Sequence, residues 1–325
     1  IRKMRSSLSY IFLALKGMAI GAADVVPGVS GGTIAFISGI YEELLNTINK
    51  LDLKFFSMGR KEGWGKAWKE YNLSFLVTLG AGVLLSILTL ARGITYLMEN
   101  EPIVLWSFFF GLVLASILYI AQQVNEWTPK GIIAMILAAA LAYFITVAAP
   151  STAPDNYWFL FISGFIAIIA MILPGISGSF ILLLLGSYAS VIGTLNMLSQ
   201  AIVSGNVDLG VQAGGRLAVF AIGAALGLKV FSKVLTWMFE NYKNLTLVVL
   251  TGFISGSLNK IWPWKEPLST YINSDGLEVP LTEKSILPGN FSGDPQVATA
   301  IIACIIGFLT IFLLEKFANR KKGEI

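Results

Sequence analysis

Pro27-Gly28-Val29-Ser30-Gly31 is repeated as Pro174-Gly175-Ile176-Ser177-Gly178, 147 positions later in the chain. Each copy is followed by an apolar run that ends in Gly-x-Tyr, beginning at Gly39 and at Gly186. Both copies lie in sequence apolar enough for a membrane, where a Pro-Gly break exposes backbone polar groups that lipid cannot satisfy. Such breaks persist only where protein or a polar cavity surrounds them, and a pair of them points to a transport site.

The composition indicates a polytopic membrane protein. Of the 325 residues, 55% are hydrophobic and 13% are charged, whereas roughly 25% are charged in an average soluble protein. The charged residues lie in clusters between apolar stretches of spanning length. The chain has no histidine, which excludes histidine metal sites and general bases, and its single Cys304 excludes a disulfide framework.

The apolar segments predict five helical elements in each half of the chain. They cover 6–23, 33–48, 73–91, 103–123 and 131–149 in the first half, and 157–172, 179–197, 217–239, 245–262 and 297–317 in the second. A second motif also recurs, 141 positions apart: Arg92, Thr95, Glu99 and Asn100 match Lys233, Thr236, Glu240 and Asn241. Repeated matches in the same order indicate a duplication, with repeats 1–152 and 153–325 in a single integral membrane domain.

The segments beside each break are short for a membrane crossing, which needs about 20 residues. We therefore interpret 6–48 and 157–197 as re-entrant helical hairpins that return to the side from which they enter. Three full crossings remain in each half, about six in all, and an odd number inverts the second half relative to the first. The expected fold is an all-α polytopic membrane protein built as an inverted repeat.

The basic residues predict the orientation of the chain. With a cytoplasmic N-terminus, the inner regions hold most of the lysines and arginines, including those between Lys50 and Lys69 and between Lys316 and Lys322. The outer regions hold Arg92, Arg216, Lys260, Lys265 and Lys284. We therefore expect cytoplasmic N- and C-termini and an outer segment, 263–296, whose glycine, proline and asparagine content is typical of a loop.

The repeated motif has the chemistry of an anion site. Proline ends the first arm of each hairpin, and the following glycine allows a ligand to approach the backbone. Ser30 and Ser177 can cap the returning helices, whose first N–H groups would then point at the hairpin tips. The predicted substrate-binding residues are Gly28, Ser30, Gly31, Gly32, Thr33, Gly175, Ser177, Gly178, Ser179 and Arg216. The alternative is that the motif is only a tight packing turn between helices.

Ionisable residues at membrane depth are candidates for a coupling or charge role. They are Lys16, Asp24, Glu42, Arg92, Lys229 and Lys233. Asp24 is either protonated when substrate binds, paired with a cation such as Lys16, or bonded to backbone N–H groups as a cap. Glu42 either titrates or is hydrated at the cytoplasmic mouth, and Arg92 and Lys233 either attract an anion or extend to lipid head groups. Lys229, within an apolar span, is expected to reach a carboxylate, a cavity or an anionic ligand.

Three stretches of the chain resemble a known family. Gly21-Ala22-Ala23-Asp24-Val25-Val26-Pro27-Gly28-Val29-Ser30-Gly31-Gly32-Thr33-Ile34-Ala35, with Gly39-Ile40-Tyr41-Glu42, is similar to the signature of the bacterial and archaeal membrane family catalogued as domain of unknown function 368. Residues 108–112 and 173–179 match it as well. Members are assigned as polyprenyl-phosphate transporters that return undecaprenyl phosphate, the lipid carrier of cell-wall precursors, from the outer to the inner leaflet. The resemblance implies this lipid as the ligand and the cytoplasmic membrane of a prokaryote as the location.

Two other classes of function compete with lipid transport. A transporter or channel for a small inorganic anion or cation would use the same hairpin tips without a lipid tail. A membrane enzyme acting on lipid phosphates is disfavoured, because the chain lacks histidine and a clustered Asp/Glu metal motif. No Gly-Lys-Ser/Thr nucleotide motif occurs, which argues against ATP-driven transport by this chain. We therefore expect a transporter in the bilayer with no catalytic residue, metal, cofactor or nucleic-acid partner.

Overall fold

The computed structural model describes residues 7–26, 28–52, 54–272 and 278–320. Most of this part is helical, and its strands form one two-stranded sheet. Within it, five helices are long and apolar enough to cross a membrane, or six if one bent pair counts as a single span. The chain is thus a helical membrane protein, as its composition predicted. Pro27 and the basic residues Arg2, Lys3, Arg5, Lys321 and Lys322 lie outside the described residues.

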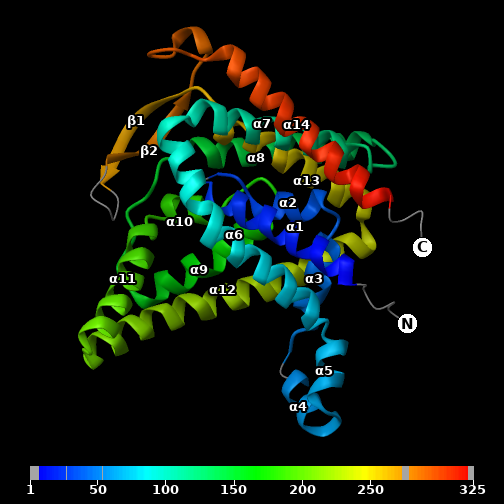
Figure 1. The fold of residues 1–325 in the computed structure, drawn as a ribbon, viewed down its shortest axis with the longest axis vertical. Helices are drawn as coiled ribbons and strands as arrows, with labels where there is room; N and C mark the ends of the chain where they lie inside the picture. The colour runs from blue at the N-terminus through cyan, green and yellow to red at the C-terminus, as the bar shows by residue number, and fades with distance from the viewer. Residues whose placement is uncertain (1–6, 27, 53, 273–277, 321–325) are drawn as a thin grey trace.

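The first half of the chain contains a hairpin of three helices, a helical projection and three long helices. The hairpin comprises the longer α1 (Ser7–Val25) and the short α2 (Gly31–Ile37) and α3 (Tyr41–Lys50). Helices α4 (Lys54–Glu62) and α5 (Trp64–Glu70) extend away from the body at the bottom of Figure 1. The long helices are α6 (Leu73–Asn100), α7 (Pro102–Ala121) and α8 (Pro129–Val147).

The second half repeats this order without the projection. Its hairpin comprises α9 (Tyr157–Ile172), α10 (Gly178–Leu184) and α11 (Tyr188–Ser204), and it is followed by α12 (Val207–Asn241) and α13 (Lys243–Ser257). A 3-10 turn, η1 (Leu258–Ile261), leads into strands β1 (Lys265–Ile272) and β2 (Glu278–Ser285). A second turn, η2 (Pro288–Asn290), precedes the last helix, α14 (Val297–Arg320).

Local side chains determine where several helices start. Thr128 precedes Pro129 and accepts a hydrogen bond from the Gly131 N–H at 3.1 Å. Asn156 and Asn206 cap α9 and α12 in the same way, at 2.8 and 3.1 Å. Such caps satisfy N–H groups that have no partner within the helix. The long helices begin within two residues of the predicted positions, except that α12 begins at Val207, ten residues before the predicted start at 217.

The returning arms of the two hairpins differ from the prediction. The sequence analysis expects one continuous segment over 33–48 and another over 179–197, but the structure breaks both. Gly39 and Gly186 have φ of 71° and 70°, a conformation that ends a helix and that glycine adopts without strain. Helices α10 and α11 consequently meet at 109°. Each hairpin therefore consists of three helices and two breaks.

The segment predicted to be a loop, 263–296, contains a β-hairpin instead. Strands β1 and β2 pair antiparallel, with Lys265 opposite Ser285 and Glu266 opposite Lys284. The prediction gave weight to glycine, proline and asparagine over the valine, isoleucine, threonine and tyrosine residues that favour strands. The hairpin lies at the upper left of Figure 1, and its strand β2 contacts α8.

Four pairs of helices form the main contacts between the long elements: α1 with α6, α9 with α12, α7 with α14, and α8 with α13. Glycines allow the backbones to approach closely. A Cβ atom at Gly82 of α6 would lie 2.2 Å from the carbonyl oxygen of Ala14 in α1, and one at Gly223 of α12 would lie 2.1 Å from that of Phe161 in α9. Backbone contact at glycines thus determines how these helices cross.

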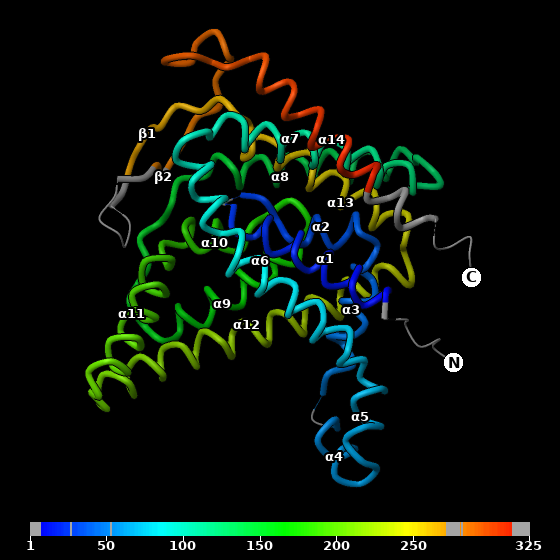
Figure 2. Tube along the Cα trace, in the orientation of Figure 1, coloured from blue at the N-terminus to red at the C-terminus, as the bar shows by residue number. Residues whose placement is uncertain are grey.

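The first hairpin forms the centre of the molecule. Figure 2 shows α1 and α2 surrounded by longer helices, and α2 contacts α1, α3, α7 and α9. Val26, Ile34 and Leu45 of this hairpin are at most 3% exposed and pack with Ile120 and Ile254 in the principal apolar cluster. The backbone on either side of the break, at Val26 and at 28–30, is therefore enclosed by protein, which is the condition for such a break in an apolar chain.

Candidate functional site

The two hairpin tips contact each other in the interior. The Thr33 hydroxyl accepts a hydrogen bond from the Gly175 N–H at 2.9 Å, and the Ser30 hydroxyl donates to the Leu173 carbonyl at 3.1 Å. The Tyr41 hydroxyl donates to the carbonyl of Ile172 at 3.0 Å. Ser30, Thr33 and Tyr41 are at most 3% exposed. The structure thus brings together the predicted binding residues of the two repeated motifs.

Gly28 and Gly175 occupy corresponding positions at the two breaks. Their φ angles are 88° and 96°, in the region that favours glycine. Protein atoms fill the space beside each of them. A Cβ at Gly28 would lie 2.7 Å from Cγ of Lys260, and one at Gly175 would lie 2.9 Å from the Ser257 hydroxyl. These glycines therefore allow close approach of protein side chains in this structure.

The two motif serines do not cap the helices as the sequence analysis expected. Ser30 and Ser177 occupy the N-cap positions of α2 and α10, but neither side chain bonds to its helix backbone. Ser177 Oγ instead lies 2.9 Å from Ser179 Oγ. At the first tip, the Asp24 carboxylate accepts the hydrogen bond of the Gly31 N–H at 2.9 Å. An ionised acceptor bonds more strongly than a hydroxyl, so the Ser30 hydroxyl is available to bond to the other tip.

Protein groups thus occupy part of the predicted anion site. The Gly31 N–H bonds to Asp24 and the Gly175 N–H bonds to Thr33. A Cβ at Gly32 would lie 2.5 Å from the carbonyl oxygen of Ile172, so this glycine also serves contact between the tips. Gly178 is similarly close to the second hairpin's own backbone: a Cβ there would lie 2.8 Å from the carbonyl oxygen of Ala167. An anion could reach the N–H groups of Gly31 and Gly175 only by displacing these partners.

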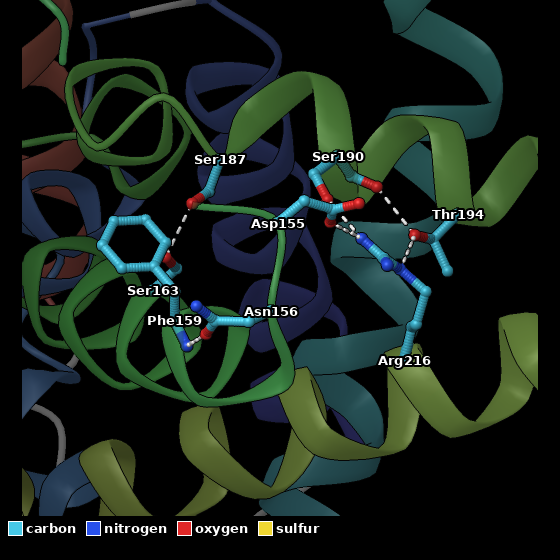
Figure 3. A network of polar contacts seen from close by, with 8 residues as sticks. All are labelled: Asp155, Asn156, Phe159, Ser163, Ser187, Ser190, Thr194 and Arg216. Atoms are coloured by element: carbon cyan, nitrogen blue, oxygen red, sulfur yellow. Dashed lines mark hydrogen bonds and ion pairs between the residues drawn. The ribbon is translucent and has the colours of Figure 1, made fainter. Parts of the chain in front are cut away.

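A cavity of about 520 Å³ lies between α9, α11 and α12, next to the break at Gly186. Arg216 of α12 lines it and donates hydrogen bonds to Ser190 Oγ at 2.8 Å and Thr194 Oγ1 at 3.3 Å (Figure 3). The same guanidinium donates to the Asp155 carboxylate. The volume falls within the range of about 300–1,000 Å³ that is usual for small-molecule sites. Arg216 is therefore the predicted binding residue that borders an open space.

Arg216 and Asp155 differ in burial. The Arg216 side chain is 17% exposed, whereas that of Asp155 is 72% exposed. The hydrogen bond from Arg216 and its positive charge hold the pKa of the Asp155 carboxyl below its ordinary value. Water can solvate Asp155 if the pair separates, but the buried guanidinium then needs another anion. The pair is thus suited to exchange of Asp155 for an anionic ligand, which a guanidinium can bind in bidentate fashion.

Neighbouring hydrogen bonds position the walls of this cavity. Asn156, next to Asp155, caps α9 through the Phe159 N–H at 2.8 Å (Figure 3). The hydroxyls of Ser163 and Ser187 are 2.7 Å apart and join α9 to the break before α11. The sequence predicted Arg216 as a binding residue but did not predict its partners Asp155, Ser190 and Thr194. Two of them could have been found, because Ser190 and Thr194 are four residues apart and therefore lie on one face of a helix.

The remaining predicted charged residues lie elsewhere. Lys16 donates to the Ser38 carbonyl at the end of α2. Glu42 forms an ion pair with Lys243 at 3.0 Å, in which both side chains are more than half exposed. Arg92 and Lys233 are exposed on α6 and α12. None of these four residues lines the Arg216 cavity.

Lys229 bonds to a different kind of group from those expected. Its ammonium donates to the backbone carbonyls of Ile48, Asn49 and Leu51, at 3.1, 2.5 and 2.6 Å. These carbonyls lie at the C-terminal end of α3, where the helix dipole is negative, and that of Ile48 also accepts a hydrogen bond from the Leu51 N–H at 3.2 Å. Lys229 therefore joins α12 to the first hairpin.

The chain is similar to a known family and to two known transporters. Residues 20–279 match the family model described as undecaprenyl phosphate translocase-like. The chain is 42% identical over 318 residues to a polyprenyl-phosphate transporter of Vibrio cholerae, covering 97% of this chain and 99% of that protein. It is 31% identical over 261 residues to a polyprenyl-phosphate transporter of Staphylococcus aureus, covering 77% and 85%. No solved structure gives a significant match.

Proposed function

This chain belongs to the undecaprenyl phosphate translocase-like family, and we propose that it transports a polyprenyl phosphate across the membrane. The ligand is undecaprenyl phosphate or a related lipid, which moves from the outer to the inner leaflet of the cytoplasmic membrane for reuse in the cell envelope. The protein acts as a transporter and not as an enzyme. The observation that carries this proposal is the largely buried Arg216 side chain, 17% exposed, beside a cavity within an apolar helical bundle.

The chemistry of the Arg216 cavity suits a phosphate monoester. Such a group carries nearly two negative charges at neutral pH and has three strong acceptor oxygens. Arg216 supplies a planar donor fork, and Ser190 and Thr194 supply hydroxyls beside it. The isoprenoid tail can remain among the lipids, so only the head group needs shelter. Exchange of the exposed Asp155 for the phosphate keeps Arg216 paired throughout.

We further propose that 1–152 and 153–325 are inverted repeats, with re-entrant hairpins at α1–α3 and α9–α11. Glycine contacts support this. Gly17 faces the Leu79 carbonyl, and Gly164 faces the Phe220 carbonyl. The members of these pairs differ by 147 and 141 positions, the offsets that relate the two sequence motifs. In addition, α7 packs on α14 and α8 on α13, so each half supplies helices to the other.

The difference between the repeats supports inward transport. At the same offsets, Phe75 corresponds to Arg216, and Glu43 corresponds to Ser190. Glu43 accepts a hydrogen bond from Asn72 at 3.0 Å. With cytoplasmic termini, the cationic pocket opens outward and its counterpart inside has an acidic side chain. A phosphate would therefore bind more strongly at the outer pocket than at its inner counterpart beside Glu43, which favours release to the cytoplasm.

The proposed movement requires the two tips to separate. Ser30, Thr33 and Tyr41 bond across the contact between the tips, and in this proposal that contact closes the route between the outer and inner sides. Three neutral hydrogen bonds, worth about 0.5–1.5 kcal/mol each, join the tips. Phosphate binding can offset this amount. The glycine breaks on both sides of α2 and α10 are the points at which the backbone can rotate.

Reconstituted transport tests this function. We would measure movement of a tail-labelled polyprenyl phosphate between leaflets of vesicles, using a quencher that cannot cross the membrane. Arg216→Met should slow transport at least about tenfold, because it removes a charged hydrogen-bond donor. Arg92→Met, the same change at an exposed arginine, should transport at the wild-type rate.

Each result distinguishes one part of the proposal. A wild-type protein that does not accelerate movement of the lipid would exclude the proposed substrate. An Arg216→Met variant with wild-type transport would remove the cavity from the route. The small-anion alternative would be favoured if inorganic phosphate blocks movement of the lipid and is itself carried across the membrane.

A further inference from the structure

Two buried lysines share a single carboxylate near the start of α10, away from the Arg216 cavity at its end. Lys260 Nζ lies 3.2 Å from Glu283 Oε2, and Lys265 Nζ lies 3.6 Å from the same oxygen. The side chains are 15%, 8% and 22% exposed in the order Lys260, Lys265 and Glu283. Among the residues that the structure describes, no other carboxylate lies within 4.0 Å of either ammonium. The cluster therefore has a net positive charge.

Lys265 is the less satisfied member. Across the described part of the chain, its ammonium finds no hydrogen-bond partner, because Glu283 is beyond bonding distance. It lies 3.8 Å from the ring centroid of Trp106, and Lys260 lies 4.6 Å from that of Phe180. Aromatic rings stabilise a cation without supplying an acceptor. A buried ammonium without hydrogen bonds is costly, so this arrangement favours an additional anion.

The cluster adjoins the first hairpin tip. The stem of Lys260 covers Gly28, whose missing side chain makes room for it: a Cβ there would lie 2.7 Å from Cγ of Lys260. Phe180, under the Lys260 ammonium, belongs to α10 of the second hairpin. Lys260 thus touches both hairpins, next to the place where Ser30 and Thr33 join them.

We propose that Lys260 and Lys265 form a phosphomonoester site, in which Glu283 is an internal anion that the ligand displaces. The carboxylate of Glu283 marks where an anion can contact both ammonium groups. The head group of a polyprenyl phosphate is the ligand if the proposed function holds, on which this part of the inference rests. Inorganic phosphate offers the same chemistry and is distinguished by experiment.

A purely structural role predicts the opposite result for one variant. If Glu283 only fastens the β-hairpin to the helices, Glu283→Gln should destabilise the protein and leave ligand affinity unchanged or lower. If Glu283 competes with a ligand, Glu283→Gln should raise phosphate affinity, because both lysines then lack their protein anion. The sign of this change therefore separates the two roles.

The test uses the full chain in nanodiscs of neutral lipid. Binding of undecaprenyl phosphate would be measured by native mass spectrometry and by the rise in melting temperature on adding ligand. Lys265→Met should weaken binding at least about tenfold, and Glu283→Gln should strengthen it. Lys284→Met makes the same change at an exposed lysine of the same hairpin and should bind as wild type. Undecaprenol, which lacks the phosphate, should show no dependence on either lysine.

The possible outcomes are distinct. Lys265→Met and Lys260→Met variants that both bind as wild type would overturn the site, as would weaker binding by Glu283→Gln. Lysine-dependent binding of inorganic phosphate alone would keep the site but contradict the proposed lipid function. If the methionine variants do not fold, the wild-type protein would be crosslinked to a polyprenyl phosphate that carries a photoreactive group in its first isoprene unit. Labelling of 258–272 supports the site, and labelling only around Arg216 overturns it.

Discussion

At the scale of single residues, the partner of a buried charge determines what that charge can do. Lys229 bonds to backbone carbonyls that cannot move away without unfolding α3, so its role is structural. Arg216 pairs with the exposed Asp155, which water can solvate instead. Among the described residues, Lys265 pairs with the Glu283 carboxylate at 3.6 Å, beyond hydrogen-bonding distance, and lies over the ring of Trp106. The second and third cations can therefore accept a ligand, whereas the first cannot.

Loss of the Lys229 ammonium should destabilise the protein. Lys229→Met removes a charged donor from three carbonyls at the end of α3, of which, within the described part of the chain, only that of Ile48 keeps a backbone donor, and we expect a loss of about 2–4 kcal/mol from hydrogen bonds to a charged group. The measurement is the melting temperature of the purified protein. Lys233→Met, one turn along the same helix at an exposed position, is the matched control. Equal melting temperatures for the two variants would contradict the structural role.

The pH dependence of stability should report the burial of Lys265. Burial lowers the pKa of this ammonium to about 8, despite the opposing charge of Glu283, whereas an exposed lysine titrates near about 10.4. The unfolded chain thus binds the proton more tightly, and stability should rise with pH between these values, by up to about 1.4 kcal/mol per pH unit. The charged groups facing it are Glu283 of β2 and Lys260 of η1.

The Lys265→Met variant provides the reference for this pH effect. We would measure the melting temperatures of both proteins from about pH 7 to 10. Above about pH 8, the melting temperature of the wild type should rise relative to that of the variant. Over the same range, phosphate affinity of the wild type should fall as the ammonium loses its proton. Parallel stability curves for the two proteins would show that Lys265 is not buried as a cation.

At the scale of elements, glycine has two separate roles in this chain. Gly39 and Gly186 end the seven-residue helices α2 and α10 through positive φ. Gly82 and Gly223 lie within long helices and make room for the backbone of a neighbouring helix. The first role shapes the hairpins, and the second determines how closely they pack against α6 and α12. Both roles recur at corresponding positions in the two halves.

A bulky residue at a helix crossing should therefore separate the helices. Gly82→Leu would place a Cβ 2.2 Å from the Ala14 carbonyl, so α1 and α6 must move apart. We expect a loss of about 1–3 kcal/mol, which is usual for overpacking, measured as a lower melting temperature. Gly80→Leu, at a glycine with no atom within 4 Å of its Cβ position, should melt as wild type. A similar loss of stability in both variants would mean that replacing glycine within α6, and not the contact between α1 and α6, is responsible.

At the scale of the whole molecule, helices from distant parts of the chain pair with one another. Helix α7 packs on α14 and α8 on α13, so neither half can be removed without exposing the other. The hairpins meet at their tips through Ser30, Thr33 and Tyr41. This interleaving supports the proposal of one membrane domain in which the hairpins approach from opposite sides.

Cysteine accessibility can test the proposed topology, because the chain has a single native cysteine. In a Cys304→Ala background, Gln123→Cys lies between α7 and α8, and Asn290→Cys lies in η2; both positions are exposed. The proposed orientation places the first inside and the second outside. In intact cells, an impermeant thiol reagent should label Asn290→Cys alone. Labelling of both positions, or of Gln123→Cys alone, would contradict the orientation.

Much of the fold could be predicted from the sequence for local reasons. Long apolar segments must satisfy their own backbone groups in lipid, so they form helices, and caps such as Thr128 and Asn156 begin them where the pattern changes. The repeated Pro-Gly motif showed where the helices break. The prediction was wrong for the returning arms, because it treated Gly39 and Gly186 as part of a continuous run.

By itself, the sequence determined that the chain is a membrane protein of apolar helices, with two matching breaks and Arg216 as a candidate ligand residue. Only the tertiary structure decided which groups meet. Asp155 reaches Arg216, Lys229 reaches the end of α3, and Lys260 covers Gly28. The helical pattern depends on neighbours within a few residues, whereas these contacts join positions 61 to more than 200 residues apart. They depend on how whole helices pack, which periodicity and spacing do not specify.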